Sequence, residues 1–89
     1  MTTNEKIEDY LRKLNTFLQN KNDDYGDSLQ NPISIFQKNK LNGILARIDD
    51  KLNRIKSVGI NDKTEDTIED LIGYLIHLKI MLDEVENVD

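Results

Sequence analysis

The chain of 89 residues has no cysteine and no tryptophan, a single proline and only four glycines. Without cysteine it can form neither a disulfide nor a thiolate metal site. The glycines do not form a loop of the kind that cradles phosphate groups, and no serine or cysteine nucleophile arrangement is recognisable. These absences exclude disulfide-stabilised domains, zinc–thiolate modules and P-loop enzymes.

Long apolar runs are also missing. The longest, residues 71–82, is interrupted by His77 and Lys79 and is too short to cross a bilayer. The first five residues lack the basic and apolar regions of a signal peptide. We therefore expect a soluble protein of the cytoplasm that does not bind membranes.

Acidic residues exceed basic ones, by 17 to 12, which gives a formal net charge of −5 and a pI near 4.8. A surface of this charge argues against non-specific binding to nucleic acid. The length predicts one domain, residues 1–89. Because so short a chain buries a modest share of its surface, an oligomer interface would add stability.

Apolar residues recur with helical spacing in three segments, which predicts an all-α fold with helices over about 4–19, 32–57 and 63–85. Thr2 and Glu5 fit a capping box at the first start, and Asp62 and Glu65 fit another at the third. Residues 20–28 are rich in Asn, Asp and Gly and are expected to form a loop. Asn31 and Pro32 suit the start of the second helix, and Gly59 is placed to end it.

The third segment is apolar on two sides. One face carries four leucines and another carries three isoleucines. These residues are Leu71, Leu75, Leu78 and Leu82, and Ile72, Ile76 and Ile80. Because two partner helices would leave one face in contact with water, we predict that the chain assembles into an oligomeric helical bundle, a dimer or larger.

Between these faces runs a polar stripe of Asp66, Asp70, Gly73 and His77. Two carboxylates one turn apart can hold a hard divalent ion, and glycine leaves room for a ligand. A solvated helix face is the alternative. His77 alone is weak evidence, since a lone histidine in an apolar helix is more often a packed residue.

A second polar face, on the middle helix, carries Arg47, Asp50, Lys51 and Arg54. It suits either surface ion pairs or a grip on phosphate groups. Tyr74 could stack on a base or fill a core. The first loop contains Lys21, Asp24, Tyr25 and Gly26. These residues suit either a ligand site or an ordinary polar turn.

Three blocks carry a resemblance to a known family: residues 21–28, residues 47–54, and residues 65–71 with Tyr74. Their order resembles the nucleotide-modification-associated domain family of bacteriophages, which is similar to MazG-like all-α nucleoside triphosphate pyrophosphohydrolases. The resemblance implies an oligomeric helical bundle with a magnesium-dependent nucleotide site, in the host cytoplasm if the chain is phage-encoded.

The resemblance also implies roles for individual residues. The catalytic acids would be Asp50, Asp66 and Asp70, and these together with Glu69 would hold Mg²⁺. The motif cations would be Lys51 and Arg54, and the loop motif would be Asp24, Tyr25 and Gly26. Together with Lys21, Arg47 and Tyr74, which are candidates from their own chemistry, these residues make up the predicted nucleotide-binding set. Related hydrolases have Glu-x-x-Glu where this chain has Asp50-x-x-Asn53, so it presents fewer carboxylates to a metal.

Three functions follow as hypotheses. The first is a nucleotide-binding protein with magnesium-dependent hydrolysis of a nucleoside triphosphate. The second is a non-catalytic sponge that sequesters a cyclic or modified nucleotide signal of host immunity, an anti-defence role. The third is an acidic protein that docks a basic partner.

Overall fold

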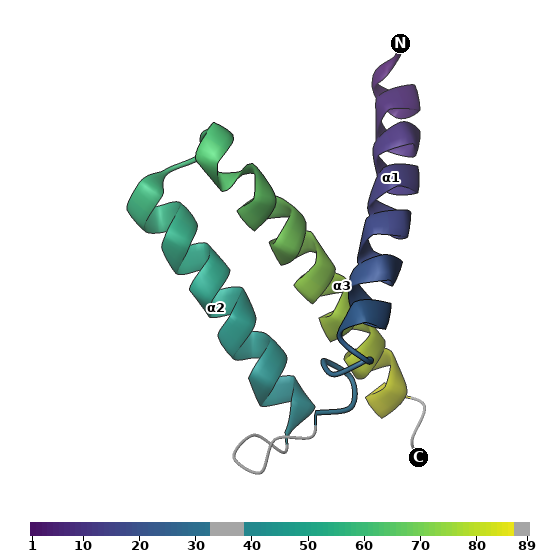
Figure 1. Cartoon of the computed structure of the whole chain (residues 1–89), viewed down its shortest axis with the longest axis vertical. Coiled ribbons are helices and arrows are strands. Elements are labelled where there is room, and N and C mark those ends of the chain that lie inside the picture. The colour runs from purple at the N-terminus through teal and green to yellow at the C-terminus, as the bar shows by residue number, and fades with distance from the viewer. Residues whose placement is uncertain (33–38, 87–89) are drawn as a thin grey trace.

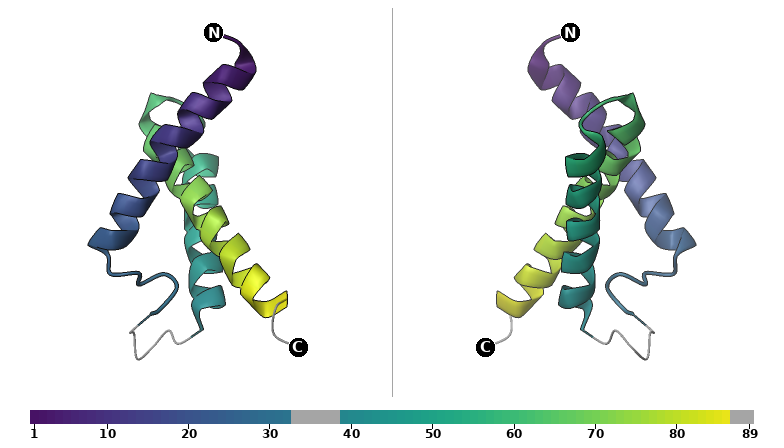
Figure 2. Two further views of the ribbon diagram at one scale, coloured as in Figure 1. Left: turned by 90° about the vertical axis from the view of Figure 1, so that its right-hand side faces the viewer. Right: turned by 90° about the vertical axis from the view of Figure 1, so that its left-hand side faces the viewer.

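A computed structural model describes residues 1–32 and 39–86. It contains three α-helices: α1 (Thr3–Asp24), α2 (Lys40–Val58) and α3 (Glu65–Glu86), with a 3₁₀ turn, η1 (Asp62–Thr64), directly before α3. α2 and α3 form an antiparallel hairpin, and α1 crosses α3 at an angle (Figures 1 and 2). In these two ranges no strand occurs, so the all-α prediction is confirmed for them.

The start of α1 is the predicted one, but its end is not. The Glu5 backbone N–H donates to the Thr2 hydroxyl, and the Thr2 N–H donates to the Glu5 carboxylate, both at 3.1 Å. The helix continues five residues past position 19, through a segment expected to be a loop. Helix propensity is a weak constraint that tertiary contacts override. Here the last turn of α1 is tied to α3 through Lys21, and the helix ends before Gly26 and Asp27, which have φ of 62° and 59°.

The predicted start of α2 at residue 32 is wrong. Asn31 and Pro32 are not helical, and the helix begins at Lys40, where the Asn39 side chain accepts from the Leu41 and Asn42 N–H groups. Residues 33–38 of the predicted helix lie outside the described residues. The predicted end is confirmed, since Gly59 adopts φ 85° and its N–H donates to the Ile55 carbonyl at 2.8 Å.

At the start of α3 the capping pair is displaced by one residue. Asn61 and Thr64 form it in place of Asp62 and Glu65. The Asn61 N–H donates to the Thr64 hydroxyl, which donates to the Asn61 carbonyl, both at 3.0 Å. Because the Thr64 side chain is fully buried, these bonds also satisfy a hydroxyl that has left water.

The apolar core is small. Ile44 of α2 and Met81 of α3 are 1% and 2% exposed, and Leu14 is the buried residue of α1. On α3, the predicted leucine face is half-buried at Leu71 and Leu78 but exposed at its other two positions. Ile76 and Ile80 of the isoleucine face are 44% and 42% exposed. The single chain therefore leaves apolar surface on α3 uncovered.

Gly73 allows α1 to approach α3 closely. A Cβ atom at this position would lie 2.8 Å from Cδ2 of Leu18, well inside contact distance. The missing side chain lets Leu18 rest against the α3 backbone, and the last turns of α1 thereby reach the side of α3 that carries Asp70 and His77. In the described ranges, no helix combines the length and apolarity that a membrane crossing requires.

Candidate functional site

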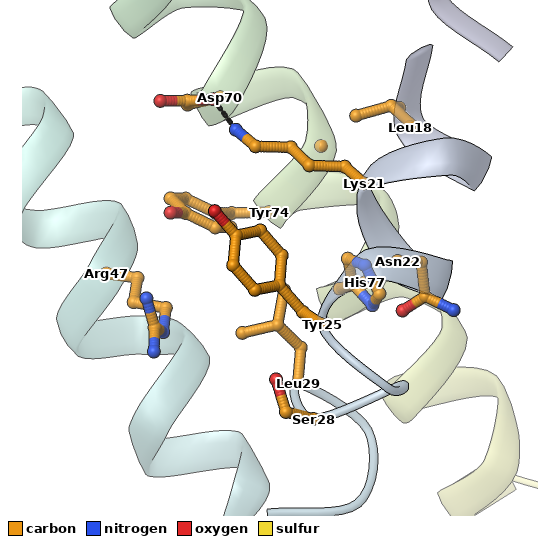
Figure 3. A pocket seen from close by; sticks show the side chains of 11 residues that line it. Leu18, Lys21, Asn22, Tyr25, Ser28, Leu29, Arg47, Asp70, Tyr74 and His77 are labelled. Carbon is orange, nitrogen blue, oxygen red and sulfur yellow. Dashed lines mark hydrogen bonds and ion pairs between the residues drawn. The ribbon is translucent and has the colours of Figure 1, made fainter. Parts of the chain in front are cut away.

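A cavity of about 360 Å³ opens where the end of α1, the turn after it, α2 and α3 come together (Figure 3). Its walls combine cations, aromatic rings, amide and hydroxyl groups and two leucines. The lining residues are Leu18, Lys21, Asn22, Tyr25, Ser28, Leu29, Arg47, Asp70, Gly73, Tyr74 and His77. The volume falls within the range of small-molecule sites.

The extension of α1 beyond position 19 creates one wall of this cavity. It places Lys21 and Asn22 on the last helical turn, beside α3. The chain then turns back through Gly26 and Asp27, both in the left-handed region, and the Asn31 amide donates to the Asp27 carboxylate at 2.6 Å. This turn brings Tyr25, Ser28 and Leu29 over the opening.

Asp70 joins all three helices. Its carboxylate accepts from Lys21 Nζ of α1 at 2.5 Å and pairs with Lys51 Nζ of α2 at 3.2 Å, and its side chain is 19% exposed. Burial alone would raise the pKa of Asp70, but the hydrogen bonds from Lys21 and Lys51 outweigh it and lower the pKa. The hydrogen bond to Asp70 raises the pKa of Lys21. Lys21 and Asp70 are therefore both charged at neutral pH.

Asp70→Asn is expected to lower the free energy of unfolding by about 1 kcal/mol at pH 7, because the lysines lose a charged acceptor. The pKa of Asp70 is below its ordinary value in the folded state. Its stabilising effect is therefore complete above the ordinary value and is lost as the pH falls through the folded-state pKa. Urea unfolding of both proteins between pH 7 and pH 2 measures the difference in their free energies of unfolding. This difference should be constant down to about pH 4 and should become smaller below it. If the difference in free energy of unfolding is the same at pH 2 as at pH 7, the ion pairs of Asp70 are not its cause.

Aromatic rings lie beside the cations. The Arg47 guanidinium is 6.0 Å from the centre of the Tyr74 ring, and Lys21 Nζ is 5.3 Å from that of Phe17. Tyr25 and Tyr74 lie between α2 and the last turn of α1, and Tyr25 is 66% exposed (Figure 3). A planar ligand entering the cavity would meet both an aromatic face and a guanidinium, each of which stacks on nucleobases.

His77 holds the turn against α3. The Gln30 amide nitrogen lies 2.9 Å from His77 Nδ1 and donates to the His77 carbonyl at 3.2 Å. Since this amide nitrogen can only donate, Nδ1 is the acceptor and the ring proton is on Nε2. Burial lowers the pKa of His77, with Asp27 partly opposing it. The ring is therefore neutral at pH 7 and adds no charge to the cavity.

The structure brings together many of the residues singled out in the sequence. Lys21, Tyr25, Arg47, Asp70 and Tyr74 line the cavity, as do Gly73 and His77 of the polar stripe. Lys51 contacts Asp70 from α2. Four lining residues were not anticipated: Leu18, Asn22, Ser28 and Leu29. Leu18 has core spacing and Leu29 is an isolated leucine, while Asn22 and Ser28 fall in the block 21–28 but were not selected as binding residues.

Other predicted residues lie elsewhere. Asp24, Gly26 and Arg54 do not line the cavity and are exposed. Of the four predicted metal ligands, Asp50 and Asp66 are exposed, and Glu69 accepts from the Tyr10 hydroxyl at 3.2 Å. The fourth, Asp70, is engaged by the two lysines. Among the described residues, no three His, Asp or Glu side chains gather in an arrangement that could hold a metal ion.

No family model, no curated protein and no solved structure shows significant similarity to the chain. The resemblance to the nucleotide-modification-associated family therefore stays a prediction from the three sequence blocks.

Proposed function

We propose that the chain binds a nucleotide in the cavity between α1, α2 and α3. The observation that supports this most strongly is the gathering of cations in an acidic protein. Lys21, Arg47 and Lys51 converge on one region from two helices, beside two tyrosine rings, although the chain as a whole carries a net charge of −5. Local positive charge next to aromatic surface suits a ligand that carries both phosphate and a base.

Each part of a nucleotide has a complementary partner here. Phosphate oxygens can accept from the ammonium of Lys21 and the guanidinium of Arg47. A base can stack against Tyr25 or Tyr74, and base stacking on an aromatic residue contributes about 1–3 kcal/mol. The neutral Asn22 and Ser28 side chains offer both donors and acceptors for the edge of a base or for a sugar.

The geometry favours binding without hydrolysis over metal-dependent hydrolysis. Asp70 lines the cavity, but its carboxylate is already paired with Lys21 and Lys51. Asp50 and Asp66 are exposed to solvent. A sponge that sequesters a nucleotide signal needs only cations, an aromatic surface for stacking and a cavity that encloses the ligand. The cavity between the three helices offers each of these. Hydrolysis of a nucleoside triphosphate with Mg²⁺ would need carboxylates to hold the metal.

One experiment separates these functions. The purified protein is mixed with a panel of nucleotides, with and without Mg²⁺, and its thermal unfolding is measured. We expect a rise of several degrees with one nucleotide class. The loaded protein is then denatured by heat and the released ligand is analysed by chromatography. Recovery of intact ligand supports sequestration, and recovery of cleaved product supports hydrolysis. No shift across the panel would contradict nucleotide binding and favour an acidic protein that docks a basic partner.

We also propose that two copies assemble through the uncovered side of α1 and α3. A shallow apolar groove there is lined by Leu11 and Leu14 of α1 and by Ile76 and Ile80 of α3, with Leu11 58% exposed. Its polar lining comprises three uncharged amides, from Asn15, Gln19 and Asn22, together with Asp23 and His77. In a two-fold dimer this patch would meet the same patch of the second copy, and its amide groups would add no like-charge repulsion to the contact.

Ile76→Asp tests this assembly. We expect a wild-type dimer at micromolar concentration and a monomeric variant, because an unpaired carboxylate in the contact costs several kcal/mol. Light scattering after size-exclusion chromatography measures both masses. Ile60→Asp is the matched control, since Ile60 is 77% exposed and lies in the connection between α2 and η1. A monomeric wild type would contradict the proposal, as would a dimeric Ile76→Asp protein.

A further inference from the structure

The charge of the cavity indicates how many phosphate groups its ligand carries, an inference that rests on the proposed nucleotide binding. Two cations line the cavity, Lys21 and Arg47, and among the described lining residues one carboxylate does, Asp70. Lys51 approaches this carboxylate from α2 at 3.2 Å and balances its charge. His77 adds none, because its Nδ1 accepts from the Gln30 amide. Counted together, the lining residues and Lys51 contribute three cations and one carboxylate, an excess of two positive charges.

We propose that the ligand is a nucleoside monophosphate. A phosphate monoester carries a charge of about −1.5 to −2 at neutral pH, which matches the two excess positive charges. A triphosphate carries roughly twice that charge, and the surplus would lie beside the Asp70 carboxylate in a partly buried site. Size points the same way. The cavity of about 360 Å³ is at the lower end of ligand sites, which run from about 300 to 1,000 Å³.

Asp70 is then the residue that sets the number of phosphate groups. Its carboxylate forms ion pairs with Lys51 and Lys21 and offsets part of their positive charge. Less positive charge is therefore available to a ligand. Asp70→Asn removes one negative charge and leaves three cations around the cavity. The variant should bind a diphosphate or triphosphate more favourably, relative to the monophosphate, than the wild type does.

Isothermal titration calorimetry with AMP, ADP and ATP, and with the same series for guanine, cytosine and uracil, measures this preference. EDTA is included because a bound metal ion would mask part of the polyphosphate charge. We expect the monophosphate of the preferred base to bind about tenfold more tightly than its triphosphate. Ribose 5-phosphate should bind more weakly than that monophosphate, since it lacks the base.

The outcomes separate this inference from the proposed function. If no nucleotide binds, both the proposed function and the inference about the number of phosphate groups are wrong. If the diphosphate or triphosphate binds more tightly than the monophosphate, nucleotide binding stands and the inference is wrong. If ribose 5-phosphate binds as tightly as the monophosphate, the cavity recognises the phosphate alone and the ligand class is wrong.

Asp70→Asn gives a second test, with Asp50→Asn as the matched control, because Asp50 is exposed and lies outside the cavity. Circular dichroism first establishes that both variants are folded. In Asp70→Asn the ratio of the dissociation constants for ATP and AMP should fall by about tenfold, and in Asp50→Asn it should stay at the wild-type value. A folded Asp70→Asn protein with the wild-type ratio would overturn the role of Asp70. If Asp70→Asn does not fold, the wild-type series alone decides the ligand class.

Discussion

Arg47→Glu is expected to weaken binding of a nucleoside monophosphate by about 100-fold, which corresponds to about 2.7 kcal/mol. The substitution removes one of the two cations that line the cavity and puts a carboxylate in its place, close to the phosphate. It also removes the guanidinium that lies 6.0 Å from the centre of the Tyr74 ring. Calorimetric titration of wild type and variant with the same monophosphate measures the effect.

Arg54→Glu is the matched control, because it makes the same charge change on the same helix. Arg54 belongs to the sequence block that resembles the nucleotide-modification-associated family, but it is exposed and does not line the cavity. We expect its effect on affinity to be threefold or less, roughly what a change in long-range attraction causes at physiological salt. A large loss in Arg54→Glu with wild-type affinity in Arg47→Glu would place the ligand on the outer face of α2 and contradict the proposed site.

Ile44→Ala is expected to lower the free energy of unfolding by about 2–5 kcal/mol, which is the usual range for truncating a fully buried isoleucine. Ile44 is 1% exposed in a core that also contains Met81 and Leu14. For a domain of this size, the loss is a large part of the total stability, which is typically about 5–15 kcal/mol. Urea denaturation followed by circular dichroism gives the difference.

Leu45→Ala provides the comparison on the same helix. Leu45 adjoins Ile44 but is 45% exposed, so its truncation should cost less than about 1 kcal/mol. Equal losses at the two positions would show that α2 buries a different side from the one described. Because the wild type is expected to dimerise, both variants are compared with it at the same protein concentration.

Helical periodicity was sufficient to predict three helices, and local capping signals located some of their ends. Thr2 with Glu5 and Gly59 act as predicted, because the bonds that they make involve only residues close in sequence. The continuation of α1 to Asp24 could not be read locally. The residues from Asn20 onward favour a loop, and a contact 49 positions away, between Lys21 and Asp70, accompanies their helical conformation.

The same long-range contacts explain which part of the site was predictable. Lys21, Arg47, Asp70 and Tyr74 attracted attention through their chemistry, and the fold brings them to one cavity. Asp70 was predicted to be a metal ligand, but in the structure it pairs with Lys21 of α1 and Lys51 of α2. Residue spacing on α3 alone could not predict contacts with lysines from two other helices. Asn22 became a lining residue through the extension of α1, and Ser28 and Leu29 through the turn at Gly26 and Asp27.

The most direct test of nucleotide binding in this cavity is a nuclear magnetic resonance titration of isotope-labelled wild-type protein with a nucleoside monophosphate. We predict that the largest changes in amide and side-chain signals will fall on Lys21, Tyr25, Arg47 and Tyr74, with little change at Arg54. Signals that do not move at millimolar ligand, or changes concentrated on the outer face of α2 around Asp50 and Arg54, would contradict the proposed site.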